Sequence, residues 1–245
     1  MQKKLRSIFY IRVSPSIDLL LAFLSELLVM GTYYFTTHTQ NPFLQLIMSK
    51  IVLSVLFTIL LPVLYMVGYK KQPLASLGIK KHLWLIALII SVIFSFIVIQ
   101  LFGHGIKFTL SIFPMVIING LNLWEPLFVY GWLQLRFENA FGAIPSIILS
   151  GLCYGFYHIG SVPIDTLFPL IGMGIIYGFL FKLSGNNLFV LFPIMWSFAE
   201  WTGITAHPSS LTSYGDIEGV IVICILLLWM AIIDRLRHRQ FVTHK

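Results

Sequence analysis

The stretch 119–139, NGLNLWEPLFVYGWLQLRFEN, places the carboxylate of Glu125 inside a long apolar run. An ionisable group within a bilayer is costly and usually functional. Asn119, Asn122 and Glu125 recur every third residue, which predicts one polar stripe along a helix. Pro126 has no N–H for the carbonyl of Asn122 and is expected to kink the helix beside the acid. The open alternative is a structural acid that is hydrogen-bonded to another helix.

The composition excludes an ordinary soluble domain. Hydrophobic residues make up 58% of the chain and charged residues 10%, with a mean hydropathy of +0.91, whereas soluble domains are about a quarter charged. The net charge of +7 does not indicate a nucleic-acid partner, because the basic residues lie at the ends of apolar segments, where they orient membrane helices. Cys153 and Cys224 lie inside apolar segments, so neither a disulfide framework nor a thiolate metal site is expected.

The apolar segments predict an all-α, polytopic membrane protein of about eight transmembrane helices. The expected spans are 16–36, 43–68, 83–103, 108–134, 143–160, 166–183, 187–204 and 217–234. The N-terminus, the segments 70–82, 135–142 and 182–186, and the C-terminal tail together hold 14 of the 16 Lys and Arg residues. Both termini are therefore expected in the cytoplasm. We interpret residues 1–245 as a single transmembrane domain, multi-pass in the cell membrane.

Two charged residues in the first spans have a structural interpretation. Glu26 and Lys50 lie within roughly 5 Å of one depth at the helical rise of 1.5 Å per residue. We expect them to form an ion pair.

Polar residues in the second half of the chain predict hydrolytic chemistry. Glu125, His158, Ser197 and Glu200 fall near one depth when the helical rise is applied to their spans. A carboxylate in a low-dielectric site becomes a competent general base at neutral pH. A nearby His can orient the same water or protonate the leaving amine, while Ser197 and Trp201 could donate hydrogen bonds to an oxyanion.

These residues resemble the CPBP (Abi) family of intramembrane proteases, which includes the type II CAAX prenyl endopeptidases and bacteriocin-processing or self-immunity proteins. The family's EExxxRG motif and the segment after it resemble residues 125–138, and its FxxxH motif resembles Tyr154-Gly-Phe-Tyr-His158. The approach to the third motif resembles residues 168–194, and the basic linker resembles residues 77–80. The resemblance covers roughly residues 75–205, which would form the protease core.

The resemblance implies that Glu125 activates water with help from His158. The third motif, HxxxN, would supply the oxyanion contacts, but its His falls on Ser197 and its Asn on Trp201. In the first motif, Pro126 stands at the second Glu and Tyr130 at the Arg. These two positions are i and i+4, neighbours on one helix face. Losing both members of an ion pair can be nearly neutral, so this double change does not indicate decay.

The function expected from the sequence is an intramembrane endopeptidase that cleaves a membrane-associated peptide or protein tail. The alternative is a catalytically impaired protein of the same fold that acts in bacteriocin immunity or as a binding scaffold. A small transporter using Glu125 and Glu200 is a third hypothesis, disfavoured because the sequence has no internal repeat. The same acids and His158 could formally hold a metal, but without a second His we expect no cofactor.

Overall fold

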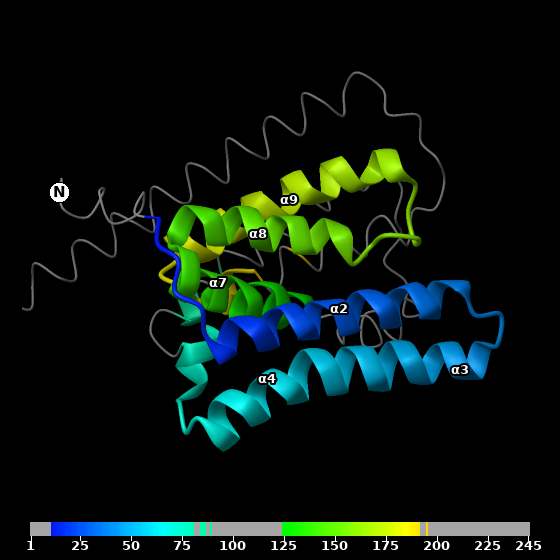
Figure 1. The fold of residues 1–245 in the computed structure, drawn as a ribbon, viewed down its shortest axis with the longest axis horizontal. Coiled ribbons are helices and arrows are strands. Elements are labelled where there is room, and N and C mark those ends of the chain that lie inside the picture. The colour runs from blue at the N-terminus through cyan, green and yellow to red at the C-terminus, as the bar shows by residue number, and fades with distance from the viewer. Residues whose placement is uncertain (1–10, 81–83, 87–88, 90–123, 192–194, 196–245) are drawn as a thin grey trace, which may run out of the picture. The chain divides into compact units, whose positions relative to one another are not determined.

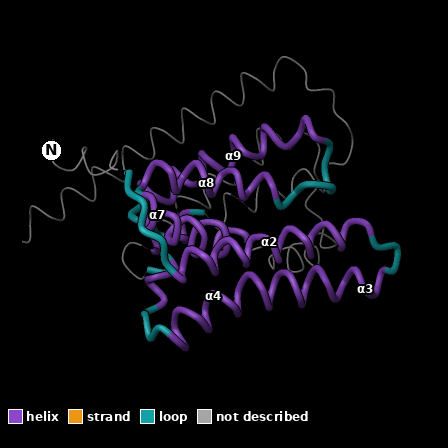
Figure 2. Tube along the Cα trace, in the orientation of Figure 1, coloured by secondary structure: helices purple, strands orange, loops and turns teal. Residues whose placement is uncertain are grey.

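The computed structural model describes residues 11–80, 84–86, 89, 124–191 and 195. The chain divides into two compact units, the first comprising residues 1–80 and 121–179 and the second residues 81–120 and 180–245. The described residues form helices and loops, with one isolated bridge between Ile159 and Val162 and no strand among them (Figure 2). The all-α prediction is confirmed for this part of the chain, and the single domain of residues 1–245 stays a prediction.

Three helices in the described part of the chain are long and apolar enough to cross a bilayer. They are α2 (Ile17–His38), the continuous helix Pro42–Tyr69 and α9 (Ile164–Leu183). The predicted spans 16–36, 43–68 and 166–183 agree with these bounds to within two residues. The spans 83–103, 187–204 and 217–234 lie mostly or entirely outside the described residues, so the eight-span topology and the cytoplasmic termini stay predictions.

Helix α2 begins where Ser16 accepts a hydrogen bond from the backbone N–H of Leu19, which satisfies one of the free donors of the first turn. Its buried side chains follow a helical spacing of three to four residues: Ala22, Ser25, Glu26, Val29, Thr32 and Thr36. The leucines at positions 20, 24, 27 and 28 are exposed on the molecule. One face of α2 therefore packs inward, and an apolar face is left for lipid.

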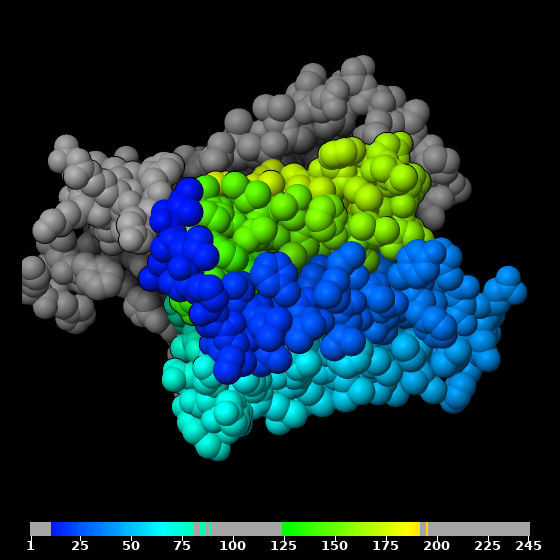
Figure 3. Space-filling model, viewed as in Figure 1, coloured from blue at the N-terminus to red at the C-terminus, as the bar shows by residue number. Residues whose placement is uncertain are grey.

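The second long helix runs beside α2, to which a short turn connects it (Figures 1 and 3). It comprises α3 (Pro42–Leu46), the π-helical segments η1 (Ile47–Leu60) and η2 (Leu64–Tyr69), and α4 (Leu61–Val63) between these two. Asn41 caps its start through the N–H groups of Phe43 and Leu44. At its other end the Tyr65 hydroxyl and the Lys70 amine contact Asp18 at 2.7 and 2.9 Å, and this carboxylate raises the pKa of Lys70.

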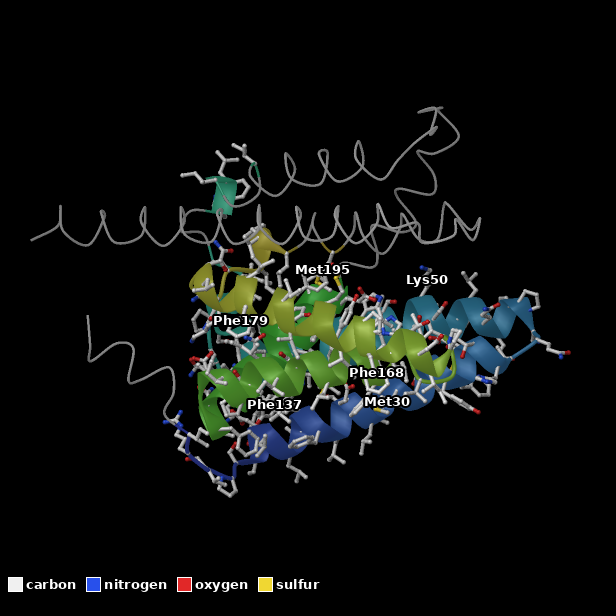
Figure 4. All side chains as sticks on the ribbon, turned by 90° about the horizontal axis from the view of Figure 1, so that it is seen from above. Met30, Lys50, Phe137, Phe168, Phe179 and Met195 are labelled. Atoms are coloured by element: carbon white, nitrogen blue, oxygen red, sulfur yellow. The ribbon has the colours of Figure 1, made fainter. Side chains whose placement is uncertain are left out.

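The predicted ion pair between Glu26 and Lys50 is wrong. Both carboxylate oxygens of Glu26 are buried and have no hydrogen-bond partner among the described residues. Glu26 lies on the inward face of α2 beside Ser25. Lys50 is only partly buried on η1, and Figure 4 shows its amine pointing away from α2. Similar depth along two helices does not put two side chains on facing surfaces, because each helix can turn its residue away.

The helix that carries Glu125 is the most deeply buried part of the first unit that the structure describes. It starts in the described region at Trp124, passes through the π-helical segment η5 (Pro126–Gln134) and continues as α7 (Leu135–Phe141). Every residue of η5 is buried, as expected for a helix with neighbours on all sides. The Trp132 indole donates to the Ser25 hydroxyl at 2.9 Å, which connects this helix to α2.

The turn predicted over residues 135–142 is wrong except at its last residue. Helix α7 continues to Phe141, and Gly142, at φ 96°, separates it from α8 (Ala143–Phe156). The misleading residue is Arg136, which is only 4% exposed. Its guanidinium lies over the Trp132 ring and donates to Met66 Sδ and to the Ser76 carbonyl. A charged side chain can remain within a helix when neighbouring segments supply its partners.

Helices α8 and α9 lie side by side at very close range (Figure 1). A Cβ at Gly174 of α9 would come within 2.7 Å of Tyr154 Cβ and 2.9 Å of Gly151 Cα, both on α8. Only small residues permit such an approach between membrane helices. Helix α8 ends at Phe156 rather than at residue 160 as predicted, because the N–H of Tyr157 closes the last turn on the Cys153 carbonyl and His158 falls in the turn beyond.

The described part of the second unit is short. It contains the last residues of α9, a turn through Gly185 (φ 75°) and Asn186 (φ 61°), and the 3-10 helix η6 (Leu188–Val190). The Asn187 side chain caps η6 by accepting from the N–H of Phe189. The predicted basic turn at residues 182–186 agrees with this end of α9.

Candidate active site

Glu125 lies directly before η5, and its side chain is 8% exposed. The hydroxyl of Tyr157, which is fully buried, donates a hydrogen bond to Glu125 Oε1 at 2.8 Å. A hydrogen bond from a phenol to a carboxylate is of the stronger, charge-assisted class. The last turn of α8 thus reaches Glu125 within the first unit.

His158 follows Tyr157 and lies against it. The two rings stack with their centroids 4.1 Å apart and an interplanar angle of 30°. His158 Nδ1 is 2.8 Å from the Tyr154 carbonyl oxygen. A carbonyl oxygen only accepts hydrogen bonds, so Nδ1 carries the proton, and in the neutral ring Nε2 keeps a lone pair. This tautomer makes Nε2 the nitrogen that can accept a hydrogen bond from water.

Aromatic side chains from three helices surround the Tyr157 and His158 rings. Tyr33 of α2 meets both rings at 5.5 Å, and Tyr154 of α8 meets them at 5.7 and 5.4 Å, all in edge-on arrangements. Trp124 approaches Tyr157 at 5.6 Å. Such edge-to-face contacts stabilise aromatic clusters. The rings hold each other in place beside Glu125.

The arrangement therefore contains a buried carboxylate and an imidazole that Tyr157 joins, through its hydroxyl on one side and its ring on the other. A carboxylate can take a proton from water, and an imidazole with a free Nε2 can orient that water. The two groups belong to residues 33 positions apart along the chain. The first unit thus gathers the residues of two separate sequence motifs into one cluster.

Comparison with protein families gives a match over part of the chain. Residues 105–199 match the family model described as Type II CAAX prenyl endopeptidase Rce1-like. This match supports the resemblance to the CPBP family over that part of the chain. No curated protein and no solved structure matches the chain.

The first CPBP motif departs from the family pattern at two buried positions, Pro126 and Tyr130. Tyr130 stands at the Arg of the motif and is fully buried. Its hydroxyl donates to the Gly174 carbonyl of α9 at 3.0 Å. Position 130 therefore contributes a bond between helices where the motif carries a charge.

Several predicted site residues lie outside the described part of the chain. These are the third-motif positions and their neighbour, Ser197, Glu200 and Trp201, together with the polar stripe residues Asn119 and Asn122. Among the described residues, no three His, Cys, Asp or Glu side chains lie close enough to hold a metal. Because Glu200 is not among them, the metal hypothesis and the accessory roles of these residues stay predictions.

Sequence reasoning did not single out Tyr157, the residue that connects the two CPBP motifs. Its signal was present: it precedes the motif His, and a tyrosine hydroxyl within a membrane needs a hydrogen-bond partner. Glu125 was an available acceptor. The signal was weak because the chain has 10 tyrosines, and spacing along the sequence does not say which one faces Glu125.

Proposed function

We propose that this protein is an intramembrane endopeptidase that hydrolyses a peptide bond in a membrane-associated peptide or protein tail. The observation that carries the proposal is the cluster in which Tyr157 bonds Glu125 at 2.8 Å and stacks on His158 at 4.1 Å. It joins the acid of the first CPBP motif to the His of the second. The match to the endopeptidase family over residues 105–199 supports the same reading.

The residues support a separate catalytic role for Glu125 and for His158. Glu125 takes a proton from water, and the resulting hydroxide attacks the carbonyl carbon of the scissile bond. His158 Nε2 accepts a hydrogen bond from the other O–H of that water and orients it, since Nδ1 is bonded to the Tyr154 carbonyl. When the tetrahedral intermediate collapses, the proton on Glu125 passes to the leaving amine. The carbon–nitrogen bond breaks, and the products are an acid and an amine.

The oxyanion contacts and the substrate class are further parts of the proposal. Ser197 and Trp201, which stand at the third-motif positions, would donate hydrogen bonds to the developing negative charge. The description of the matching family makes prenylated C-terminal tails the first substrates to test. The protein would work as a multi-pass protein of the cell membrane.

The test compares two Glu→Gln changes in the same unit. Glu125→Gln keeps the size of the side chain but cannot take the water's proton. Glu26→Gln is the matched control, because Glu26 is also a buried glutamate, at 5% exposure, and lies outside the motifs. Peptides in membranes from cells producing each variant are compared by mass spectrometry, and purified protein is assayed on farnesylated C-terminal peptides.

Precursor peptides that accumulate with Glu125→Gln but not with Glu26→Gln support the peptidase. Identical peptide profiles for wild type and Glu125→Gln, with no cleavage of any peptide by purified wild type, would overturn it.

A second candidate function is peptide binding without cleavage, in bacteriocin immunity or as a scaffold. The observation that favours it is the replacement of both third-motif residues by Ser197 and Trp201. In that case Glu125→Gln leaves the peptide profile and the cellular phenotype unchanged. Substitutions at Ser197 or Trp201 would then alter binding of a peptide that is never cut.

A further inference from the structure

Tyr157 makes two different contacts with the two motif residues. Its hydroxyl donates to Glu125 Oε1 at 2.8 Å, and its ring stacks on the His158 ring at 4.1 Å. No part of its side chain is exposed. A buried hydroxyl with a carboxylate acceptor is strongly held, because leaving either group unsatisfied in a low-dielectric site is costly.

The backbone and neighbours of Tyr157 fix the direction in which its hydroxyl points. Its N–H bonds the Cys153 carbonyl at 3.1 Å, so the residue is tied to the last turn of α8. Edge-on contacts with Tyr33 and Tyr154 and a tilted contact with Trp124 confine the ring. The donor is thus held from α8 while the acceptor belongs to the start of η5. The hydrogen bond limits the rotation of the Glu125 carboxylate.

We propose that Tyr157 is a positioning residue of this site: its hydroxyl holds the Glu125 carboxylate, and its ring holds the His158 imidazole, in the relative orientation that water activation needs. This inference rests on the proposed function. Small errors in the placement of a general base are expensive, since displacement by about 1 Å can cost on the order of a hundredfold in rate.

A purely structural role for Tyr157 makes a different prediction. In that case the hydroxyl only satisfies the carboxylate, and its loss lowers stability without changing the state of Glu125 in the folded protein. The chain offers a matched control in Tyr65, whose hydroxyl donates to a carboxylate oxygen of Asp18 at 2.7 Å. Tyr65→Phe removes the same chemical bond from a place far along the sequence from both motifs.

The first measurement is an infrared spectrum of the purified protein in detergent, which needs no substrate. Subtracting the Glu125→Gln spectrum from that of wild type isolates the carboxyl bands of Glu125. We expect Tyr157→Phe to shift these bands and Tyr65→Phe to leave them in place. Bands at the wild-type position in Tyr157→Phe would overturn the inference, whatever the protein does in cells.

The second measurement is peptide cleavage by the same variants. We expect Tyr157→Phe to lower kcat on the order of tenfold to a hundredfold with little change in KM, and Tyr65→Phe to leave both unchanged. Shifted bands with full turnover would overturn the positioning role. If wild type cleaves nothing, the proposed function fails, while the infrared shift still decides whether Tyr157 holds Glu125.

If Tyr157→Phe does not fold, the same hydrogen bond can be measured from the tyrosine side in variants that keep Tyr157. Tyrosine residues labelled with carbon-13 beside the hydroxyl report phenol hydrogen bonding in the infrared spectrum. We expect one tyrosine band to differ between wild type and Glu125→Gln, and no such difference between wild type and Glu26→Gln. Identical tyrosine bands in wild type and Glu125→Gln would overturn the inference.

Discussion

Two glycines of α9 give a sharp test of how the site is supported. Gly174 faces α8, where an added Cβ would meet Tyr154 Cβ at 2.7 Å, Gly151 Cα at 2.9 Å and Gly151 O at 3.0 Å. Gly172, two residues earlier, has nothing within 4 Å of the same added atom. Both residues lie in one helix, so Gly→Ala brings each the same gain in helix propensity, up to about 1 kcal/mol.

The two substitutions should therefore change the free energy of unfolding differently. Gly172→Ala is expected to be neutral or to stabilise by up to about 1 kcal/mol. At Gly174 two of the three close atoms belong to the Gly151 backbone, which cannot rotate away, so overpacking of about 1–3 kcal/mol outweighs the gain. Thermal unfolding of both variants in the same detergent measures the difference. Equal midpoints would refute the close α8–α9 contact.

The same contact predicts an effect on activity. The clash at Gly174 pushes on Tyr154, whose carbonyl accepts the Nδ1 hydrogen of His158 at 2.8 Å. Gly174→Ala should lower peptide cleavage even in the fraction that stays folded, whereas Gly172→Ala should leave cleavage unchanged. Full turnover by folded Gly174→Ala would show that the position of α9 does not control the His158 ring.

Three further predictions follow from the buried polar residues and the basic loops. Pro126→Glu alone should destabilise the fold by about 3–5 kcal/mol, since it buries an unpaired carboxylate. Adding Tyr130→Arg should restore part of the lost stability. Equal unfolding midpoints for the single and double variants would show that the two positions are not coupled. Glu26→Met should raise the unfolding midpoint, because neither carboxylate oxygen of Glu26 has a hydrogen-bond partner among the described residues; a lower midpoint would contradict this. Reporter fusions after Lys245 and within residues 208–215 should report opposite sides of the membrane, and the same side for both would remove the eight-span topology.

Hydrophobicity and length were sufficient to locate the three long apolar helices in the described part of the chain. The predicted bounds of the first two spans agree with Ile17–His38 and Pro42–Tyr69 to within two residues, because a membrane helix is defined by an uninterrupted apolar run. The charge of Arg136 misled the prediction of a turn. Its partners, Met66 and Ser76, lie 60 or more residues away in the sequence. No local pattern reveals a charge that is satisfied at such a distance.

The candidate site was predictable only in part, for a similar reason. The rarity of polar residues in the apolar segments was enough to select Glu125 and His158, and the motif resemblance gave them roles. Their connection depends on the direction of one side chain, Tyr157, at the end of α8. The failed pairing of Glu26 with Lys50 shows the same limit, since depth along a helix is readable from sequence but the facing direction of two helices is not.

The altered first motif shows how this chain keeps its central helix in place without the family's charges. Glu and Arg four residues apart would pair along one helix face. Such a pair stabilises its own helix and does not bond it to a neighbouring helix. Tyr130 instead donates to the Gly174 carbonyl, 44 residues away on α9. Because Pro126 and Tyr130 are both uncharged, the change at these two positions leaves neither partner of the motif's ion pair buried alone. Gly174 thereby has two roles. Its carbonyl accepts the hydrogen bond from η5, and its lack of a side chain lets α8 pack closely. The seam between α8 and α9 therefore fixes both the helix that follows Glu125 and the turn that holds His158.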